Sequence, residues 1–398
     1  MTVTQKTRVA LVALNDPSGG GAHGYEGGVI SALTSQKDST FDFLIYAPKK
    51  LNVATKKRFP HLEVCSYQSG LFTMIFLSIR NSLQGYKILK AVGLRYGKLE
   101  RSFVRNRISL AYFLTPNALA LDLVDTPMIN TVWDLGHRDI PEFVEISGDR
   151  HFEERELFYR QILPKSFRVI VDTERTSLRI QQCYGVLSER VLVGGIGATK
   201  LDVAGQSTSS PENFFLYPAQ FWPHKRHVLL LKAFQIVCEQ EADCKLVLTG
   251  SDKGNLRHVM KVATKLNLDT KVEFRGFVAT SELAVLIRDA RCLVFPSQLG
   301  PSNMPPLEAA MLGTPSLISN VHADPLLEHP LIKTVQSQEP EDWAFEMLRM
   351  WRGPKPSVQV LTYSNLHYLE EISKTLNEFE ARRSEWASIQ DRRFKRTD

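Results

Sequence analysis

The chain has 398 residues, too many for one ordinary domain and suitable for two domains of roughly 150–200 residues each. Hydrophobic residues make up 43% and charged residues 23% of it, the composition of soluble globular proteins. No run of about 18 uncharged apolar residues occurs, so we expect no bilayer-spanning segment. The amino-terminal residues also lack the apolar region of a secretory signal, and the net charge of +6 is modest for this length.

Cysteine usage indicates a reducing compartment. The five cysteines are scattered and form no C-x-x-C pair. This pattern predicts buried, reduced thiols in a cytoplasmic protein, and excludes a disulfide framework or a zinc site built on cysteine pairs.

Short apolar, β-branched runs alternate with helical periods through most of the chain. Continuous apolar strands separated by helices are typical of parallel sheets that are covered on both faces. The sequence therefore predicts an α/β fold with two doubly wound, Rossmann-like domains. The expected strands are 8–14, 41–46, 109–113, 128–133, 168–171 and 190–193 in the first half, and 214–217, 245–249, 271–275, 292–295 and 316–319 in the second.

A stretch rich in Gly, Ser and Thr near 194–213 has little apolar periodicity and is typical of an interdomain linker. We expect an amino-terminal domain over 1–200, a linker over 201–212 and a second domain over 213–360. The remaining residues, 361–398, are predicted to form an exposed helix that ends in a basic tail.

The segment Tyr217-Pro-Ala-Gln-Phe-Trp-Pro-His-Lys-Arg-His leaves a strand and enters a helix that is expected to begin near Lys225. A lysine at such a junction can reach a diphosphate above the carboxyl edge of the sheet, where helix amides add positive charge. A solvated lysine at a helix start is the other interpretation of this residue.

A second segment follows the strand at 292–295: a loop rich in Gly, Pro, Ser and Asn, then a helix expected to start at Pro305 or Pro306. Amides near Asn303, Met304 and Leu307 would point at a ligand above the strand end. Glu308 is predicted in the first helical turn, where its carboxylate can accept from sugar hydroxyls or simply complement the helix dipole.

These two segments, with Leu246-Val-Leu-Thr-Gly-Ser and Val272-Glu-Phe-Arg-Gly-Phe-Val between them, resemble the donor domain of retaining family-4 GT-B glycosyltransferases. The resemblance covers roughly 214–330. It implies a nucleoside-diphosphate-sugar donor whose diphosphate is neutralised by Lys225. The other implied donor contacts are Glu308 at the ribose, Phe277 and Val278 at the base, Gly250 and Ser251 at the phosphates, and Ser302, Asn303, Met304 and Leu307 at the transferred sugar and phosphates.

Two positions depart from the family pattern. The paired glutamates of the family lie eight positions apart, and Gly300 stands eight before Glu308. The usual arginine before the lysine aligns with Gln220. The role of the first glutamate at the sugar must be filled otherwise, and Asn303 is the candidate.

The glycine-rich segment that starts at Ser18 follows the first predicted strand. Gly19, Gly21 and Gly24 spell G-x-G-x-x-G, but the acidic residue of a dinucleotide site is missing at the end of the second strand. A loop whose Gly20 and Gly21 approach the donor phosphates fits the resemblance better than an NAD site; a merely flexible loop is the alternative.

Thr131-Val-Trp-Asp-Leu-Gly-His resembles the strand and loop of the family's amino-terminal domain, with Trp133 in place of its first histidine. Asp134 and His137 are predicted to face the cleft, where either could orient the acceptor hydroxyl or take its proton. A structural histidine is the other interpretation.

A basic stretch occupies 76–109, with apolar residues interleaved. Such an element can lie on an anionic membrane surface or be a solvated helix face. No nucleic-acid-binding module is recognisable. The only acidic residue of the stretch 76–109 is Glu100. Its basic residues are Arg80, Lys87, Lys90, Arg95, Lys98, Arg101, Arg105 and Arg107.

The predicted reaction is transfer of a sugar from a nucleotide-diphosphate donor to an acceptor hydroxyl, with retention implied by the resemblance, in bacterial surface polysaccharide assembly. We expect no cofactor and no metal, because a D-x-D motif is lacking from any suitable loop. The expected partners are the donor, a saccharide or lipid-linked saccharide, and the inner face of the plasma membrane. A sugar-nucleotide epimerase, a phosphorylase-like enzyme and a catalytically silent sugar-nucleotide-binding subunit stay open as alternatives.

Overall fold

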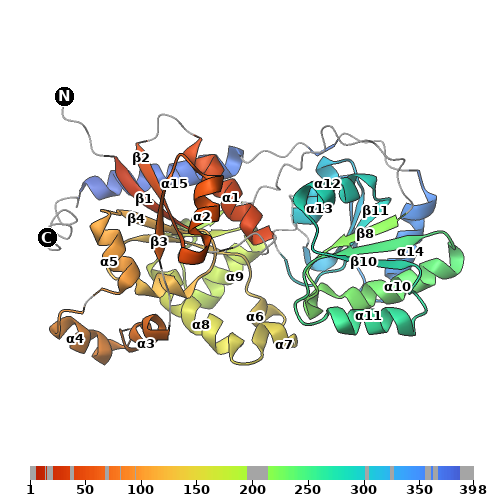
Figure 1. Cartoon of the computed structure of the whole chain (residues 1–398), viewed down its shortest axis with the longest axis horizontal. Helices are drawn as coiled ribbons and strands as arrows, with labels where there is room; N and C mark the ends of the chain where they lie inside the picture. Colours follow the sequence, from red (N-terminus) through yellow and green to blue (C-terminus); the bar gives the residue numbers. More distant parts are fainter. Residues whose placement is uncertain are drawn as a thin grey trace. The chain divides into compact units, whose positions relative to one another are not determined.

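The computed structural model describes residues 6–13, 15, 21–35, 40–67, 71–80, 82–94, 96–194, 214–300, 304–322, 327–354, 360–361 and 366–385. The chain divides into two compact units (Figure 1), and each unit contains its own parallel sheet. The first unit comprises Met1–Trp133, Glu153–Gly194 and Asn365–Asp398, and the second comprises Asp134–Phe152 and Gly195–Ser364. The predicted α/β class with two doubly wound domains is confirmed.

In the first unit, the described residues form a seven-stranded parallel sheet in the order β3-β2-β1-β4-β5-β6-β7. Its central strands β1, β4 and β5 are buried at every position except Arg8, because helices cover both faces of a doubly wound sheet. The strands are β1 (Thr7–Val12), β2 (Phe41–Pro48), β3 (Glu63–Tyr67), β4 (Leu110–Phe113), β5 (Met128–Val132), β6 (Arg168–Val171) and β7 (Val191–Val193).

The helices of this unit follow the strands in βα alternation. The described α-helices are α1 (Gly21–Thr34), α2 (Asn52–Arg58), α3 (Leu71–Arg80), α4 (Leu83–Ala91), α5 (Lys98–Arg105), α8 (His151–Ile162), α9 (Glu174–Tyr184) and α15 (Leu366–Ser384).

The glycine-rich segment is helical from Gly21 onward, which corrects the prediction of a loop at that position. Helix α1 forms because Tyr25, Val29, Ile30 and Leu33 recur at helical spacing and are buried, and this apolar face outweighs the weak helix propensity of glycine. Gly20 lies outside the described residues.

The second unit has a six-stranded parallel sheet among its described residues, in the order β10-β9-β8-β11-β12-β13. Its strands are β8 (Phe214–Pro218), β9 (Lys245–Thr249), β10 (Val272–Gly276), β11 (Cys292–Phe295), β12 (Ser316–Ser319) and β13 (Ile332–Val335). Its described α-helices are α6 (Gly136–Asp139), α7 (Val144–Ser147), α10 (His227–Gln240), α11 (Leu256–Lys265), α12 (Thr280–Asp289), α13 (Met304–Met311) and α14 (Pro340–Arg352).

All eleven predicted strands are present, and two more were missed. The missed strands, β3 and β13, lie at the outer edges of the two sheets. These edge strands are only partly buried, so β3 (Glu-Val-Cys-Ser-Tyr) and β13 (Ile-Lys-Thr-Val) lack a continuous apolar run.

Helix α15 is not the exposed helix that we predicted. Its residues Tyr368, Ile372, Leu376 and Phe379 are buried, and the Tyr368 hydroxyl lies 2.6 Å from that of Tyr112 on β4. This helix therefore belongs to the first unit, although it follows the second unit in the sequence. The predicted linker at 201–212 and the basic tail beyond 385 lie outside the described residues.

The five cysteines form no disulfide, although the Cys238 and Cys244 sulfurs lie 3.4 Å apart. The prediction that all five are buried is wrong, because Cys65, Cys183 and Cys238 are only partly buried. Within the described part of the chain, no helix combines the length and the apolar character needed to cross a bilayer.

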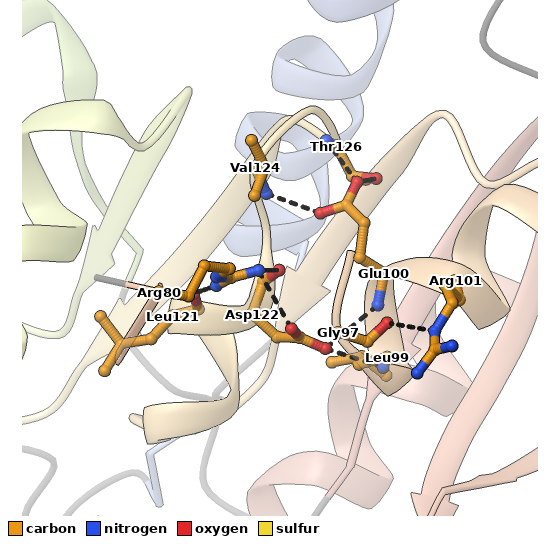
Figure 2. Close-up of polar contacts among 9 residues, drawn as sticks. All are labelled: Arg80, Gly97, Leu99, Glu100, Arg101, Leu121, Asp122, Val124 and Thr126. Carbon is orange, nitrogen blue, oxygen red and sulfur yellow. Dashed lines mark hydrogen bonds and ion pairs between the residues drawn. The ribbon is translucent and has the colours of Figure 1, made fainter. Parts of the chain in front are cut away.

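The basic stretch folds into α3, α4 and α5, and its charges do not all reach the surface. Figure 2 shows Arg80, the last residue of α3, turned into a buried cluster with Asp122 and the backbone oxygen of Leu121. The guanidinium lies 3.1 Å from the Asp122 carboxylate, and the exposed fractions of the two side chains are 2% and 1%. Arg80 is therefore a structural anchor rather than a surface cation.

The same cluster fixes the start of α5. The Asp122 carboxylate accepts from the amides of Leu99 (2.7 Å) and Glu100 (3.2 Å) in the first turn of the helix, where the backbone N–H groups have no carbonyl of the same helix to bond. The buried Glu100 carboxylate accepts from the amides of Val124 and Thr126. Every charged group drawn in Figure 2 at this junction thus has polar partners, which ties α3 and α5 to the body of the unit.

We predict that Arg80→Ala lowers the free energy of unfolding of the first unit by about 3–5 kcal/mol, because it removes the ion-pair partner of the buried Asp122 carboxylate. Urea unfolding monitored by circular dichroism measures the change. Arg105→Ala, which removes an exposed arginine of α5, is the control and should change stability by less than about 0.5 kcal/mol. Equal effects of the two substitutions would contradict the anchor.

Candidate active site

The candidate site lies at the carboxyl edge of the second sheet. Strands β8, β9, β10 and β11 are parallel, so the loops that follow them emerge at one edge. The chain turns from one side of β8 to the other when it passes from β10 to β11, which makes the β8–β11 boundary a topological switch point. Ligands of open α/β sheets bind at such points.

Lys225 stands in a short 3₁₀ turn, Pro223–Lys225, directly after β8. The next residue, Arg226, adopts the left-handed conformation (φ 53°) and starts α10, so the chain reverses sharply here. The Tyr217 hydroxyl donates to the Lys225 carbonyl (2.8 Å), and the Gln298 amide donates to the His224 carbonyl (2.9 Å). The backbone that carries Lys225 is therefore fixed from two sides.

The Lys225 ammonium lies against the loop that leads from β11 to α13. Its Nζ atom donates to the Ser297 hydroxyl (3.1 Å) and the Leu299 carbonyl (2.8 Å), and lies 5.6 Å from the centre of the Phe295 ring. Burial lowers the pKa of Lys225 to about 8, while the nearby Asp134 carboxylate acts in the opposite direction. Lys225, which is predicted to bind the donor diphosphate, is thus in contact with the loop that leads into α13.

Gly300 explains one departure from the family pattern. Its φ of 139° is a conformation that only glycine adopts readily, and a Cβ built there would lie 3.2 Å from the Lys225 Nζ atom. A glutamate at this position would therefore be strained and would crowd the ammonium. Because Gly300 has no side chain, the Lys225 ammonium has room beside it.

Asp134 belongs to the second unit, at the start of the segment Asp134–Phe152. Its carboxylate accepts from the Gly136 amide (2.8 Å) in the turn that enters α6, and its charge raises the pKa of Lys225. The Asp134 carboxylate is therefore near enough to Lys225 to raise the pKa of its ammonium. Its predicted role at the acceptor hydroxyl stays a prediction.

His137 is buried in the second unit. It has no exposed area, and its ring packs edge-on against Phe152, with the ring centres 5.5 Å apart. Its predicted part in orienting the acceptor stays a prediction.

No sequence pattern pointed to Glu145 and His224, which lie together beside Lys225 in the structure. Glu145 Oε1 accepts from the His224 amide (2.9 Å) and lies 3.0 Å from its Nδ1 atom. Burial and the adjacent Lys225 charge lower the pKa of His224 to about 4, so its imidazole is neutral near pH 7. No spacing pattern links two residues that stand 79 positions apart.

The ends of β8 and β9 pack backbone to backbone. Gly250 has φ 143°, and a Cβ there would lie 2.2 Å from the Ala219 carbonyl oxygen, so a side chain is excluded. The Phe221 amide donates to the Ser251 carbonyl (3.0 Å), and the Gln220 carboxamide accepts from the Trp222 indole (3.0 Å). The loops after β8 and β9, which carry the predicted donor-site residues Gln220, Gly250 and Ser251, are therefore in direct backbone contact.

Phe277 and Val278 follow β10 at the same edge. The Phe277 side chain is 58% exposed, which leaves its ring available for stacking, whereas Val278 packs partly against the core. Their predicted contact with the donor base stays a prediction.

Helix α13 begins at Met304, one or two residues before the predicted start, and this places Glu308 in the second turn instead of the first. Met304 and Leu307 are buried, so only their backbone can meet a ligand. Glu308 is 7% exposed, and burial raises its pKa from 4.5 to about 7. A carboxylate that burial destabilises is a candidate for ligand binding rather than a stabilising partner of the helix dipole.

Three residues assigned to the donor site, Gly20, Ser302 and Asn303, lie outside the described residues. Gly21 opens α1 in the first unit. In the described ranges, no three His, Cys, Asp or Glu side chains are grouped to hold a metal ion, and the expectation of a metal-free reaction stays a prediction.

Comparison with known proteins agrees with the α/β fold of two units. Residues 202–325 match the family model for glycosyl transferases group 1. The chain has the GT-B fold: it matches Anabaena HepE, solved with UDP and glucose, with a TM-score of 0.67, 14% identity and coverage of 94% of this chain and 100% of that one. Sucrose-phosphate synthase from Thermosynechococcus elongatus gives a TM-score of 0.67 at 17% identity, covering 96% and 100%.

The chain is also similar to two curated mannosyltransferases. The serotype-specific mannosyltransferase WbdA of Escherichia coli is 25% identical over 202 residues, 50% of this chain and 25% of WbdA. The O-antigen chain mannosyltransferase RfbU of Salmonella typhimurium is 28% identical over 142 residues, 36% of this chain and 39% of RfbU. The matched stretches thus span well under two thirds of these relatives.

Glu308 gives a test that separates binding from stability. Its pKa is raised on folding, so its contribution to stability is fully present below pH 4.5, declines above it, and is lost once the pH has risen through about 7. We predict that Glu308→Gln raises the free energy of unfolding at pH 8 by roughly 2–3 kcal/mol and leaves it unchanged at pH 4.5.

Melting temperatures at the two pH values measure this difference. Glu239→Gln, which changes an exposed carboxylate of α10, is the matched control and should show no pH-dependent gain. A lower melting temperature of Glu308→Gln at pH 8 would instead make Glu308 a stabilising residue.

Proposed function

We propose that this chain is a hexosyltransferase that moves a sugar, with retention, from a nucleoside-diphosphate sugar to an acceptor hydroxyl. The observation that carries the proposal is the Lys225 ammonium, fixed at the β8–β11 switch point against the loop that leads into α13. The GT-B fold and the match to the group 1 family model support it. The names of the mannosyltransferase relatives support a role in bacterial surface polysaccharide assembly.

The proposed chemistry depends on charge at the leaving group. The bond between the anomeric carbon and the β-phosphate oxygen breaks, a bond to the acceptor oxygen forms, and the acceptor hydroxyl releases its proton. Negative charge then develops on the departing diphosphate. Lys225 and the first amides of α13 are fixed positive groups at that place, so they stabilise the transition state more than the ground state.

The rest of the donor has a residue for each part. We assign Glu308 to the ribose hydroxyls, the exposed Phe277 ring to the base, and the backbone at Gly250 and Ser251 to the phosphates. With His137 buried, Asp134 is the candidate for orienting the acceptor hydroxyl. No cofactor or metal is needed in this scheme.

We predict that Lys225→Ala weakens binding of UDP or GDP, whichever the protein prefers, at least tenfold, or by about 1.4 kcal/mol. Isothermal titration calorimetry at pH 7 measures the affinity. The control is Lys232→Ala, which removes an exposed lysine from the following helix and should leave the affinity unchanged.

The pH dependence provides a second readout of the same residue. Because the pKa of Lys225 is lowered to about 8, raising the pH from 7 to 9 removes its charge and should weaken diphosphate binding in the wild type but not in Lys225→Ala. An equal pH dependence in both proteins would remove Lys225 from the site.

We also propose a cytoplasmic location at the inner face of the membrane, with the surface of α3 and α4 as the contact. No aspartate or glutamate occurs between Glu63 and Glu100, and Lys87 and Lys90 are exposed on α4. Apolar side chains on and after these helices are exposed at 46–74%: Ile75, Ile79, Leu83, Ile88, Val92 and Leu94. Exposed apolar residues beside unopposed cations fit an anionic lipid surface, and such a surface would present a lipid-linked acceptor.

We predict that wild-type protein sediments with vesicles of phosphatidylglycerol and phosphatidylcholine but not with pure phosphatidylcholine vesicles. The double variant Lys87→Ala/Lys90→Ala should bind the mixed vesicles roughly tenfold or more weakly, at about 1 kcal/mol per lysine.

The matched control, Lys56→Ala/Lys57→Ala, removes two exposed lysines from α2 of the same unit. Equal losses in the two double variants would show a general charge effect and would reject α3 and α4 as the contact surface.

A further inference from the structure

The segment Asp134–Phe152 carries a second carboxylate toward the diphosphate lysine. Glu145 lies on α7, eleven residues after Asp134, and belongs to the same compact unit as Lys225. One of its oxygens, Oε1, accepts from the backbone amide of His224 (2.9 Å) and lies 3.0 Å from His224 Nδ1. A single carboxylate thus holds both the main chain and the side chain of the residue that precedes Lys225.

This contact is sheltered from water. The side chains of His224 and Glu145 are 9% and 12% exposed, and the Phe143 ring packs edge-on against the imidazole with ring centres 6.4 Å apart. Because a carboxylate oxygen accepts hydrogen bonds, the His224 Nδ1 atom is the donor in this arrangement. Hydrogen bonds to a carboxylate in a sheltered place hold geometry more firmly than bonds between neutral groups.

Three parts of the chain meet at this turn. Tyr217, on β8, holds the Lys225 carbonyl, and Gln298, after β11, holds the His224 carbonyl. Glu145 holds the His224 amide and ring from the segment between the strands of the first sheet. The direction of the Lys225 side chain follows from these anchors, because the turn is fixed on both sides of the residue.

The segment also contacts Leu299, whose carbonyl oxygen accepts from the Lys225 ammonium. A Cβ built on Gly136 would lie 2.7 Å from the Leu299 side chain, so α6 packs directly against the residue whose carbonyl accepts from Lys225 Nζ. The Asp134 charge faces the same ammonium. The segment Asp134–Phe152 thus contacts His224, which precedes Lys225, and Leu299, which accepts from its Nζ atom, and it also carries the Asp134 charge.

We propose that Glu145 is a positioning residue for Lys225, and that the seating of Asp134–Phe152 on the donor edge sets the affinity for the diphosphate. This inference rests on the proposed function, because it assumes that Lys225 binds a diphosphate. It adds a specific dependence: the part of the ligand that Glu145 controls is the diphosphate, and not the base or the ribose.

The test compares a nucleoside diphosphate with its own nucleoside. UDP, GDP and dTDP are titrated into the wild type by calorimetry, and the tightest ligand is carried forward with its nucleoside. Glu145→Ala should weaken binding of the diphosphate five- to tenfold and leave binding of the nucleoside unchanged. A loss of general structural integrity would weaken both ligands.

A double-mutant cycle links the effect to the lysine. In a Lys225→Ala background, Glu145→Ala should have no further effect on diphosphate affinity, because its target is absent. Glu142→Ala, which removes an exposed carboxylate three residues away in the same segment, is the matched control and should bind both ligands like the wild type.

The outcomes separate the two hypotheses. Unchanged diphosphate binding by Lys225→Ala, or a wild type that binds none of the three diphosphates, would overturn the proposed function itself. If Lys225→Ala binds weakly while Glu145→Ala binds like the wild type, or if the two effects add fully, only the positioning role is overturned. Should Glu145→Ala not fold, Glu145→Asp replaces it, since the shorter side chain keeps the charge but cannot reach both donors.

Discussion

The second unit of this protein is organised around one partly buried cation, the Lys225 ammonium. The Lys225 ammonium is held by two neutral oxygens, from Ser297 and Leu299, in a place where burial already lowers its pKa to about 8. A cation in such a place attracts an anionic ligand more strongly than a solvated lysine does, because the ligand meets less competing water. The left-handed Arg226 and the glycine at position 300 serve this arrangement, since one turns the chain and the other leaves room for the ammonium.

Glu308 shows the same principle with the opposite charge. Burial on α13 raises its pKa to about 7, so the ligand-free protein keeps a carboxylate in surroundings that disfavour its ionised form. Strongly shifted groups of this kind concentrate where a ligand, rather than the protein, completes the set of partners. Burial disfavours the charged forms of both Lys225 and Glu308, which follow strands at one edge of the sheet. This arrangement does not serve the stability of the fold, which favours a functional role.

The basic stretch illustrates how packing redistributes charges that the sequence presents together. Counted along the chain, Arg80 and Glu100 look like two members of a solvated surface. In the fold both are buried, Arg80 against Asp122 and Glu100 against the amides of Val124 and Thr126. Their burial anchors α3 and α5, whereas Lys87, Lys90 and the apolar residues of α4 stay outside and give that helix a surface of its own.

Local patterns by themselves determined the α/β class, eleven strands, and the placement of Lys225 and Glu308 after strand ends, because a buried strand needs a continuous apolar run and parallel strands share one carboxyl edge. Tertiary structure decided what depends on partners distant in the sequence. The edge strands β3 and β13, the docking of α15, the burial of His137 and the join between Glu145 and His224 leave no periodic trace. Periodicity reports which face of an element is buried, but the identity of the group that covers it is set only when the chain has folded.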